Sequence, residues 1–205
     1  YLQLHENQKA IALFQQLKTL NPHYQSLYLY LAEALQEEEQ LEEAKAVIEE
    51  GIAENPFQVE LYQFASENAY RLHDIAGAEN WLLKALELGE KTDESRLTLS
   101  NLYLTEERFE EVITILNDLE ETDHPYAEWN LAKAYNELED FAVAKVHYEQ
   151  AAQELSHEPE FLKEYALFLR EEGELEKAKH LLHHYLEHEP GDVDMQSVLA
   201  DMEER

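Results

Sequence analysis

Apolar residues recur along this chain at the three- and four-residue spacing of amphipathic helices, in pairs of segments separated by short polar stretches. The pattern is clearest in residues 25–58. A first apolar stripe consists of Tyr28, Leu31, Ala32 and Leu35. A second, after the polar segment 36–40, consists of Leu41, Ala44, Ile48, Gly51 and Ile52, and Asn55-Pro56 ends it. The pattern predicts a helical hairpin, two helices joined by a short turn.

The same hairpin pattern recurs at an interval close to 34 residues, in segments 25–58, 59–92, 93–124, 125–158 and 159–192. Pro125 and Pro159 stand at the predicted start of a helix, where a missing N–H costs nothing. Segment 93–124 has only 32 residues, so we expect a shortened loop near 121–124. Residues 1–24 form a half repeat whose first helix precedes Tyr1, and 193–205 form a closing helix. We therefore predict a single domain, 1–205, of about twelve helices.

The length of the unit and the order of its packing positions resemble the tetratricopeptide repeat. The positions that carry the resemblance are Tyr28, Leu31-Ala32, Leu35, Ala44, Ile48 and Pro56. The resemblance implies an all-α fold, a right-handed superhelical solenoid of antiparallel helix pairs. Small residues at fixed positions permit close helix approach, and stacking is compulsory because no hairpin buries its apolar face alone.

Composition narrows the functions further. The chain has 15 Lys+Arg and 46 Asp+Glu, a net charge of −31, which disfavours nucleic acid as a partner. It has no cysteine, which fits a reducing compartment, and no apolar run near the ~18–20 residues that span a bilayer. We expect a cytoplasmic protein that does not insert into membranes. A signal or anchor upstream of Tyr1 is left open.

The family resemblance implies that first helices line a concave groove that binds a segment of another protein. In the early repeats this face is acidic, and includes Glu33, Glu60, Gln63, Glu67, Tyr70 and Glu94. Later first helices mix aromatic, amide and cationic residues, and we predict the partner site there. Its predicted residues are Tyr70, Asn101, Tyr126, Trp129, Asn130, Lys133, Asn136, Lys163, Leu167 and Arg170.

Each part of this site has an alternative interpretation. Trp129 is also suited to covering the neighbouring helix. The cations Lys133, Lys163 and Arg170 either meet an acidic partner group or neutralise nearby acids of the same chain. For the acidic early repeats, the corresponding hypothesis is a basic segment passing over Glu33, Glu60 and Glu67, against a merely solvating surface.

Some family members grip a peptide's C-terminal carboxylate with lysines and asparagines of successive first helices. Asn101 and Asn130 match the two asparagines of that clamp. Leu97 stands where its first lysine belongs, and Glu160 and Glu164 stand where its last two cations belong. Binding of a C-terminal carboxylate is therefore disfavoured.

Catalytic and metal-binding motifs are sparse. His180, His184 and His188 share one face of a predicted second helix, a spacing that can chelate zinc or nickel. An exposed pair of imidazoles binds metal loosely, so we favour a solvated surface over a physiological metal site. The sequence contains no glycine-rich phosphate loop and no nucleophile elbow. We predict no cofactor and no enzymatic activity.

These observations together predict a non-catalytic, monomeric scaffold that binds a peptide or protein segment in its concave groove. Two alternatives stay open. One is a receptor module for signalling peptides within a larger regulator. The other is a structural module that self-associates end to end through its exposed stacking faces. Light scattering across a concentration range separates the self-associating module from the scaffold and the receptor, because only self-association raises the mass with concentration.

Overall fold

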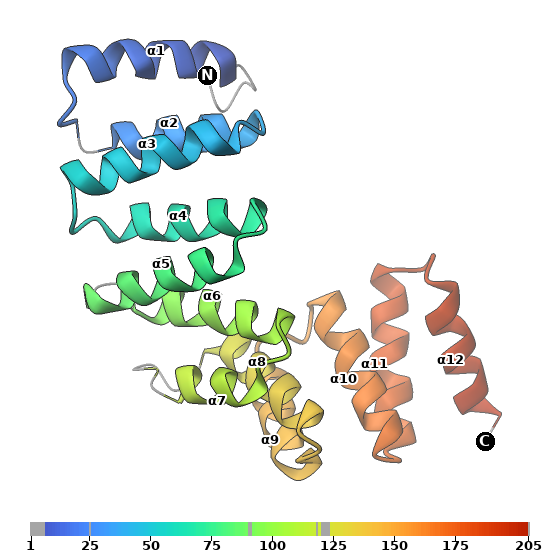
Figure 1. Ribbon diagram of the computed structural model, residues 1–205. Coiled ribbons are helices and arrows are strands. Elements are labelled where there is room, and N and C mark those ends of the chain that lie inside the picture. The colour runs from blue at the N-terminus through green and yellow to red at the C-terminus, as the bar shows by residue number, and fades with distance from the viewer. Residues whose placement is uncertain (1–6, 25, 90–91, 118, 120–123, 205) are drawn as a thin grey trace. The chain divides into compact units, whose positions relative to one another are not determined.

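The computed structural model describes residues 7–24, 26–89, 92–117, 119 and 124–204, and these form twelve helices and no strand (Figure 1). The helices are α1 (Asn7–Leu20), α2 (Leu27–Glu37), α3 (Leu41–Glu54), α4 (Val59–Arg71), α5 (Ile75–Glu87), α6 (Thr92–Thr105), α7 (Phe109–Leu116), α8 (Pro125–Glu137), α9 (Phe141–Ala151), α10 (Pro159–Glu171), α11 (Leu175–His188) and α12 (Val193–Glu203). The prediction of about twelve helices in an all-α chain is confirmed. The shortened loop expected near 121–124 lies, apart from His124, outside the described residues, and so does Tyr1.

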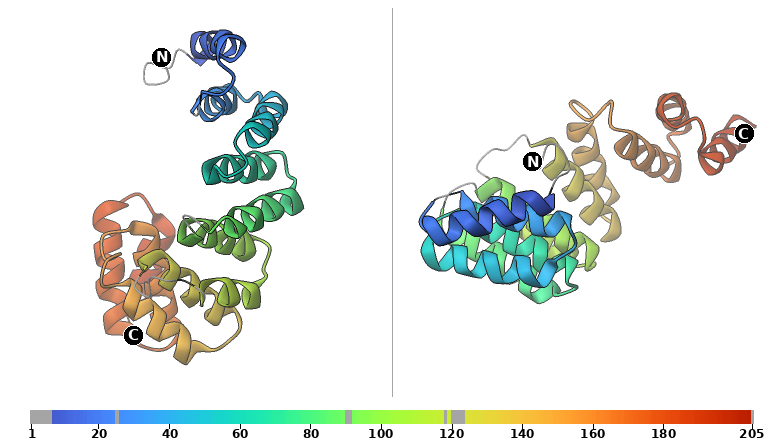
Figure 2. Two further views of the ribbon diagram at one scale, coloured as in Figure 1. Left: turned by 90° about the vertical axis from the view of Figure 1, so that its left-hand side faces the viewer. Right: turned by 90° about the horizontal axis from the view of Figure 1, so that it is seen from above.

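The chain divides into two compact units. Unit 1 consists of residues 1–106 with 118–120 and contains α1 to α6; unit 2 consists of 107–117 with 121–205 and contains α7 to α12. Within unit 1 each helix packs against the next, and the first helix α2 also contacts the first helix α4 of the following repeat (Figure 1). Within unit 2, α8 packs on α7 and α9, and α11 packs on α10 and α12. Figure 2 gives two further views of each unit. The predicted single solenoid domain stays a prediction.

The turn between the two helices of each hairpin repeats with the chain's own period. Two residues after the end of each first helix the backbone is left-handed, at Glu39 (φ 57°), His73 (φ 61°), Glu107 (φ 56°), Glu139 (φ 60°) and Gly173 (φ 79°). In the α4–α5 turn, the N–H of His73 donates to the carbonyl of Tyr70 (2.9 Å) and the N–H of Asp74 to that of Ala69 (2.8 Å). These two bonds satisfy carbonyl groups that the helix end leaves unpaired.

An aspartate follows the left-handed residue in two of these turns and starts the second helix. The Asp74 carboxylate accepts the N–H of Gly77 (2.9 Å), and the Asp140 carboxylate accepts that of Val143 (3.4 Å). Both bonds satisfy N–H groups that would otherwise lack a partner in the first helical turn. The sequence therefore stops one helix and starts the next within about three residues.

Small residues permit the helices to approach closely, as predicted. The alanines that recur at the small positions of the repeat are 0–3% exposed: Ala10, Ala32, Ala44, Ala78, Ala132, Ala144, Ala166 and Ala178. α2 and α3 approach each other closely at Gly51, where an added Cβ would lie 2.7 Å from the Cβ of Tyr28. Glycine is therefore the residue that this helix pair accommodates without a shift.

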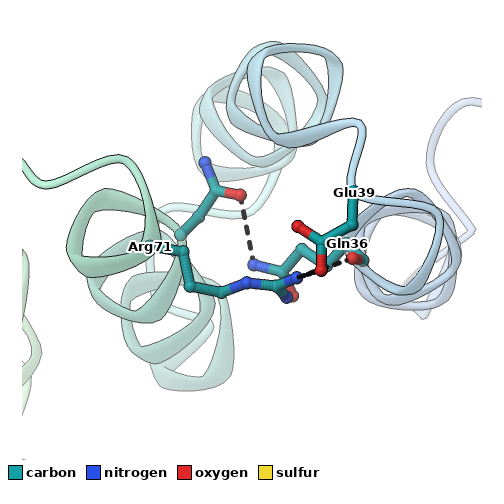
Figure 3. A network of polar contacts seen from close by, with 4 residues as sticks. Gln36, Glu39 and Arg71 are labelled. Carbon is teal, nitrogen blue, oxygen red and sulfur yellow. Dashed lines mark hydrogen bonds and ion pairs between the residues drawn. The ribbon is translucent and has the colours of Figure 1, made fainter.

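A polar network joins the first two complete repeats in unit 1 (Figure 3). Asn68 on α4 is 1% exposed; its amide donates to the carbonyl of Leu41 (3.0 Å) and accepts from the Gln36 amide (3.3 Å). Arg71 Nη2 donates to the carbonyl of Gln36 (2.9 Å) and to Oε1 of Glu39 (3.0 Å). The network attaches the α2–α3 turn to α4, so it fixes how these two hairpins stack.

Aromatic rings form the core of unit 2. The ring of Tyr148 is stacked on that of Tyr165 (5.1 Å) and lies 4.8 Å from that of Phe168. The Tyr148 hydroxyl donates to Oε1 of Glu164 (2.9 Å). Burial raises the pKa of the Tyr148 hydroxyl, and burial with the nearby charge of Glu149 raises that of Tyr165 to about 12. Both tyrosines are therefore neutral at physiological pH.

Candidate functional site

The ten predicted partner-site residues are distributed over both units, and each unit is described by itself. Tyr70 on α4 and Asn101 on α6 belong to unit 1. The remaining eight lie on α8 and α10 of unit 2. Within unit 2, the rings of Tyr126 and Trp129 lie 6.4 Å apart, and Nζ of Lys133 lies 3.8 Å over the ring of Trp129.

Trp129 reaches from α8 to the neighbouring first helix, α10. Its indole meets the ring of Phe161 edge-on, with centroids 5.6 Å apart and planes at 89°. Phe161 is 0% exposed, so the indole covers a core residue of the next repeat. The half-buried Trp129 therefore packs as the alternative interpretation predicts, and Tyr126, 41% exposed, is the open aromatic ring on this helix.

The predicted cations of unit 2 each have an acidic neighbour within the unit. Lys133 Nζ lies 3.5 Å from Oε2 of Glu164. Arg170 Nη2 lies 3.7 Å from Oε1 of Glu171. Lys163 Nζ lies 2.9 Å from Oδ2 of Asp192. These pairs match the alternative in which the cations neutralise acids of the same chain.

Asp192 is the most strongly perturbed carboxylate at this surface. It accepts hydrogen bonds from the Tyr185 hydroxyl (2.7 Å), from Lys163 (2.9 Å) and from the N–H of Met195 (3.1 Å). These bonds, that from Tyr185 first, lower the pKa of Asp192 to about 2. Asp192 thus starts α12 and also ties it to α10 and α11.

The other predicted residues have varied positions. Asn130 is 4% exposed and lies inside the packed layer, and Leu167 packs against the unit 2 core. Asn136 is half-buried near the end of α8, and Asn101 is exposed on α6. Arg170 lines a cavity of about 300 Å³ together with Leu175 of α11 and with Val198, Asp201 and Met202 of α12.

Unit 1 contains a cavity between the first helices α4 and α6, with a volume of about 460 Å³. Its lining consists of Glu60, Gln63, Phe64, Ser66, Glu67, Tyr70, Ala78, Leu82, Glu94, Thr98 and Leu102. Five of these are groove positions that the family resemblance implies, namely Glu60, Gln63, Glu67, Tyr70 and Glu94. Of the predicted partner-site residues, Tyr70 therefore lies in this cavity.

The cavity has an apolar floor and an acidic rim. The floor includes Phe64 and the buried residues Ala78, Leu82 and Leu102. Among the described residues that line it, three are glutamates and none is lysine or arginine. The Gln63 amide donates to Oγ of Ser95 (3.4 Å) and so links α4 to α6 beside the cavity. The acidic face is visible in the sequence, although the sequence pattern placed the predicted partner site mainly in later repeats.

A second cavity of unit 1, about 540 Å³, lies between the second helices α3 and α5. Trp81 lies in its lining, with Nζ of Lys84 4.2 Å over its ring. The charges here are mixed, because Glu42, Glu49 and Asp74 lie beside Lys45 and Lys84. This cavity therefore lacks the uniform charge of the α4–α6 cavity.

Only some of the histidines of α11 lie close to one another. The ring of His184 lies 5.3 Å from that of His188 and 5.8 Å from that of His157. His180 lines a separate cavity of about 350 Å³ with Tyr165 and Lys177. Within the described ranges, no group of three or more His, Cys, Asp or Glu residues is arranged to hold a metal ion. None of the described helices has the length and apolar character needed to cross a bilayer.

Antiparallel helix pairs at an interval of 34 residues, small residues at fixed packing positions and a recurrent left-handed turn define a class of repeat protein. The chain belongs to the tetratricopeptide repeat family. Residues 1–66 match the family described as tetratricopeptide repeat, and residues 125–192 match the one described as YpiA-like, C-terminal tetratricopeptide repeats. The predicted family is therefore confirmed.

Known proteins resemble the chain over almost its whole length. The TPR repeat-containing protein YpiA of Bacillus subtilis (strain 168) is 32% identical over 197 residues, which cover 95% of this chain and 47% of that protein. The chain thus spans about half the length of this curated relative.

Two solved structures have the same fold at low identity. The structure of PilF from Pseudomonas aeruginosa is 16% identical, with a TM-score of 0.78, over 98% of this chain and 92% of that one. The structure of YrrB, a TPR protein with an unusual peptide-binding site, is 14% identical, with a TM-score of 0.67, over 90% of this chain and 96% of that one. Proteins of this family generally mediate protein–protein interactions and are typically non-catalytic.

Proposed function

We propose that this chain is a non-catalytic interaction scaffold that binds a segment of another protein in the cavity between α4 and α6. The observation that carries the proposal is the cavity itself, formed by first helices at positions where the family's groove is expected. The peptide-binding site of YrrB supports the same role for a chain of similar fold. The absence of cysteine supports a reducing compartment such as the cytoplasm.

The size and lining of the cavity suit a few side chains of a partner segment. Its volume of about 460 Å³ lies within the ~300–1,000 Å³ typical of ligand sites. Tyr70, 45% exposed at its edge, offers a large, fairly rigid surface whose burial costs little side-chain entropy. Phe64 and Leu82 supply the apolar surface that an inserted side chain would cover. We propose that the chain binds this segment as a monomer.

A second candidate surface is the aromatic and cationic face of α8 in unit 2. The exposed ring of Tyr126 beside Trp129 and Lys133 favours it. A partner there would have to exchange with existing contacts, because Lys133 is paired with Glu164. We therefore rank this surface below the α4–α6 cavity.

Selection from a random peptide library displayed on phage tests the proposal, with Thr98→Trp as the blocking variant. Thr98 is exposed, lines the cavity, and donates from Oγ1 to the carbonyl of Glu94 (2.9 Å). Thr114 on α7 is exposed and makes the same contact to the carbonyl of Glu110 (2.8 Å), so Thr114→Trp is the matched control.

Selected peptides should bind the unmodified chain and Thr114→Trp alike, and Thr98→Trp much more weakly. If they bind all three proteins equally, the α4–α6 cavity is not the binding site. Sensitivity to Tyr126→Ala instead would move the function to the second surface. Light scattering on the same samples tests the self-assembly alternative, which requires a mass that grows with concentration.

A further inference from the structure

We infer that the cavity between α3 and α5 is a second binding site, which takes a small organic acid with a bulky apolar body. None of the described residues that line this cavity also lines the α4–α6 cavity, so the inference is independent of the function proposed above. Three observations support it: the origin of the cavity, the lysines in its lining and the position of Trp81.

The cavity exists because α4 has two alanines where the other repeats have large residues. Counted from the repeat starts at 25, 59, 93, 125 and 159, the seventh and eleventh residues are Ala65 and Ala69 in the repeat that starts at 59. Both line the cavity of about 540 Å³. The cavity formed on α10 and α11 by the same positions of the last repeat is smaller, about 350 Å³. The large residues at these positions elsewhere are Leu31 and Leu35, Leu99 and Tyr103, Leu131 and Tyr135, and Tyr165 and Leu169.

Two lysines without an acidic partner line this cavity, Lys45 of α3 and Lys84 of α5. The chain has 15 Lys+Arg against 46 Asp+Glu, so a cation readily finds a carboxylate. Neither lysine forms an ion pair with any residue that the structure describes. An anionic group in the cavity would supply the partner that both lack. The lysines and arginines with a described ion pair are Lys18, Arg71, Arg108, Lys133, Lys145, Lys163, Arg170, Lys177 and Lys179.

Trp81 holds one of these lysines at the cavity. Nζ of Lys84 lies 4.2 Å over the indole ring, in a contact with the face of the ring that uses none of its N–H donors in a hydrogen bond. The ammonium group therefore keeps its donors for a carboxylate. The half-buried indole and the buried Ile48 provide apolar surface in the same lining. A ligand that rests its apolar body there brings its carboxylate to Lys84.

The acidic residues of the lining restrict the size of the anion. Asp74 is occupied, because its carboxylate accepts the N–H of Gly77 (2.9 Å). Glu42 and Glu49 are exposed and would repel a long acidic segment, as would the net charge of −31. A single carboxylate held beside the lysines meets less repulsion. The volume also lies within the ~300–1,000 Å³ typical of small-molecule sites, so we assign a free organic acid rather than an acidic protein segment.

The test compares biphenylacetate with three relatives that change one property each. Biphenylacetamide has the same rings without the charge, biphenylmethylamine reverses the charge, and acetate lacks the rings. A blocked peptide, acetyl-Gly-Glu-Phe-Gly-amide, carries a carboxylate and a ring on a polypeptide. Ligand-observed NMR measures binding to the unmodified chain. In Trp129→Phe, Trp81 is the only tryptophan, and its emission reports on the cavity itself.

The first pair of variants tests the space in the cavity. Ala69→Leu fills the floor with a residue that other repeats have at this position, so the helix pair should accept it. Ala53→Leu makes the same exchange at an exposed position of α3 outside the lining and is the matched control. Thermal unfolding of each variant checks that the fold is intact.

The second pair of variants tests the charge. Lys45→Gln/Lys84→Gln removes both lysines of the cavity. Lys177→Gln/Lys179→Gln removes two lysines of α11 in unit 2, so it changes the net charge by the same amount away from the site.

Biphenylacetate should bind at least about threefold more tightly than the amide or the amine, and acetate alone should not bind. Its affinity should fall about tenfold or more in Ala69→Leu and about fivefold in the cavity lysine variant, and change less than about twofold in each control. Failure of biphenylacetate to bind, equal binding of the amide or the amine, or equal weakening in a control and its partner variant would each overturn the inference. Tighter binding of the blocked peptide than of biphenylacetate would overturn the assignment to a free organic acid.

Discussion

Glu139→Gly should stabilise the protein, because Glu139, in the turn after α8, has φ 60°, a backbone conformation that L-residues adopt only at a cost. That cost is about 1–2 kcal/mol for a residue with a Cβ, against about 0.5–1 kcal/mol of extra chain entropy that glycine loses on folding. The expected gain is thus about 0.5–1 kcal/mol. Gly173, with φ 79°, occupies the equivalent position in the next repeat. A Cβ there would meet nothing within 4 Å, so Gly173→Ala isolates the backbone cost.

Urea unfolding monitored by circular dichroism gives the free energies, with Glu139→Ala as the reference that removes the carboxylate but keeps the Cβ. Glycine should be more stable than alanine by about 1 kcal/mol at both positions, equivalent to about 2–4 °C in melting temperature. Repeat arrays can unfold in steps, so midpoints and slopes are compared for each transition. If Glu139→Gly proves less stable than Glu139→Ala, the assumed strain at this turn is absent.

Three further substitutions test the packing, the caps and the charges. Gly51→Ala should destabilise by about 1–2 kcal/mol in urea, since α3 would overpack against α2, whereas Gly191→Ala, with open space around it, should change stability little. Asp74→Ala should cost about 1 kcal/mol by removing the cap of α5, and Asp74→Asn should restore most of it in the same assay. The Asp192 carboxylate, with its pKa lowered from 3.8 to about 2, stabilises the fold fully above pH 4 and loses this contribution as pH falls toward 2. The stability difference between the unmodified chain and Asp192→Asn should therefore close between about pH 4 and pH 2 in acid titrations; a constant difference would contradict this assignment.

The helices could be predicted from the sequence because hydrophobic periodicity and prolines are local signals. Pro125 and Pro159 indeed occupy the first turns of α8 and α10. The buried alanines could also be predicted, since the repeat shows at which positions neighbouring helices need small residues. The left-handed turns could not be predicted. Glycine is the residue that indicates this conformation in a sequence, and glutamate or histidine occupies four of the five positions.

The candidate site was harder to predict from the sequence, because it depends on where the terminal groups of long side chains lie in the folded chain. Lys133 and Lys163 stand at groove positions in the sequence, but their four-carbon stems let them reach Glu164 and Asp192. Asn130 has a polar side chain, and yet it is 4% exposed in the packed layer. Repeat position alone did not distinguish these cases. The acidic residues of the rim could be recognised in the sequence, whereas the cavity between α4 and α6 could not be predicted from it.

The cavity between α4 and α6 is explained by one pair of repeat positions. Counted from the repeat starts at 25, 59, 93, 125 and 159, they are the fifth residue of one repeat and the third residue of the next. The third residue is buried in each repeat and in the closing helix: Leu27, Leu61, Ser95 and Phe161 are each 0% exposed, Ala127 is 2% exposed and Met195 is 8% exposed. Leu29 packs with the cluster that contains Leu61, and Trp129 packs on Phe161, so bulky side chains fill the space between those first helices. Between α4 and α6 the pair is Gln63 and Ser95, joined by one hydrogen bond of 3.4 Å.

This comparison predicts that the residue at the fifth position decides whether a groove between first helices is open. Gln63→Trp should fill the α4–α6 cavity and abolish the peptide binding proposed for it, while leaving stability nearly unchanged, because Gln63 is only half-buried. Trp129→Gln, the reverse exchange, should uncover Phe161 and lower the free energy of unfolding by about 1–3 kcal/mol. Peptide binding and urea unfolding of both variants check the pair. If Gln63→Trp still binds peptides as the unmodified chain does, the absence of a bulky side chain at this position does not explain the cavity's function, and the binding surface must lie elsewhere.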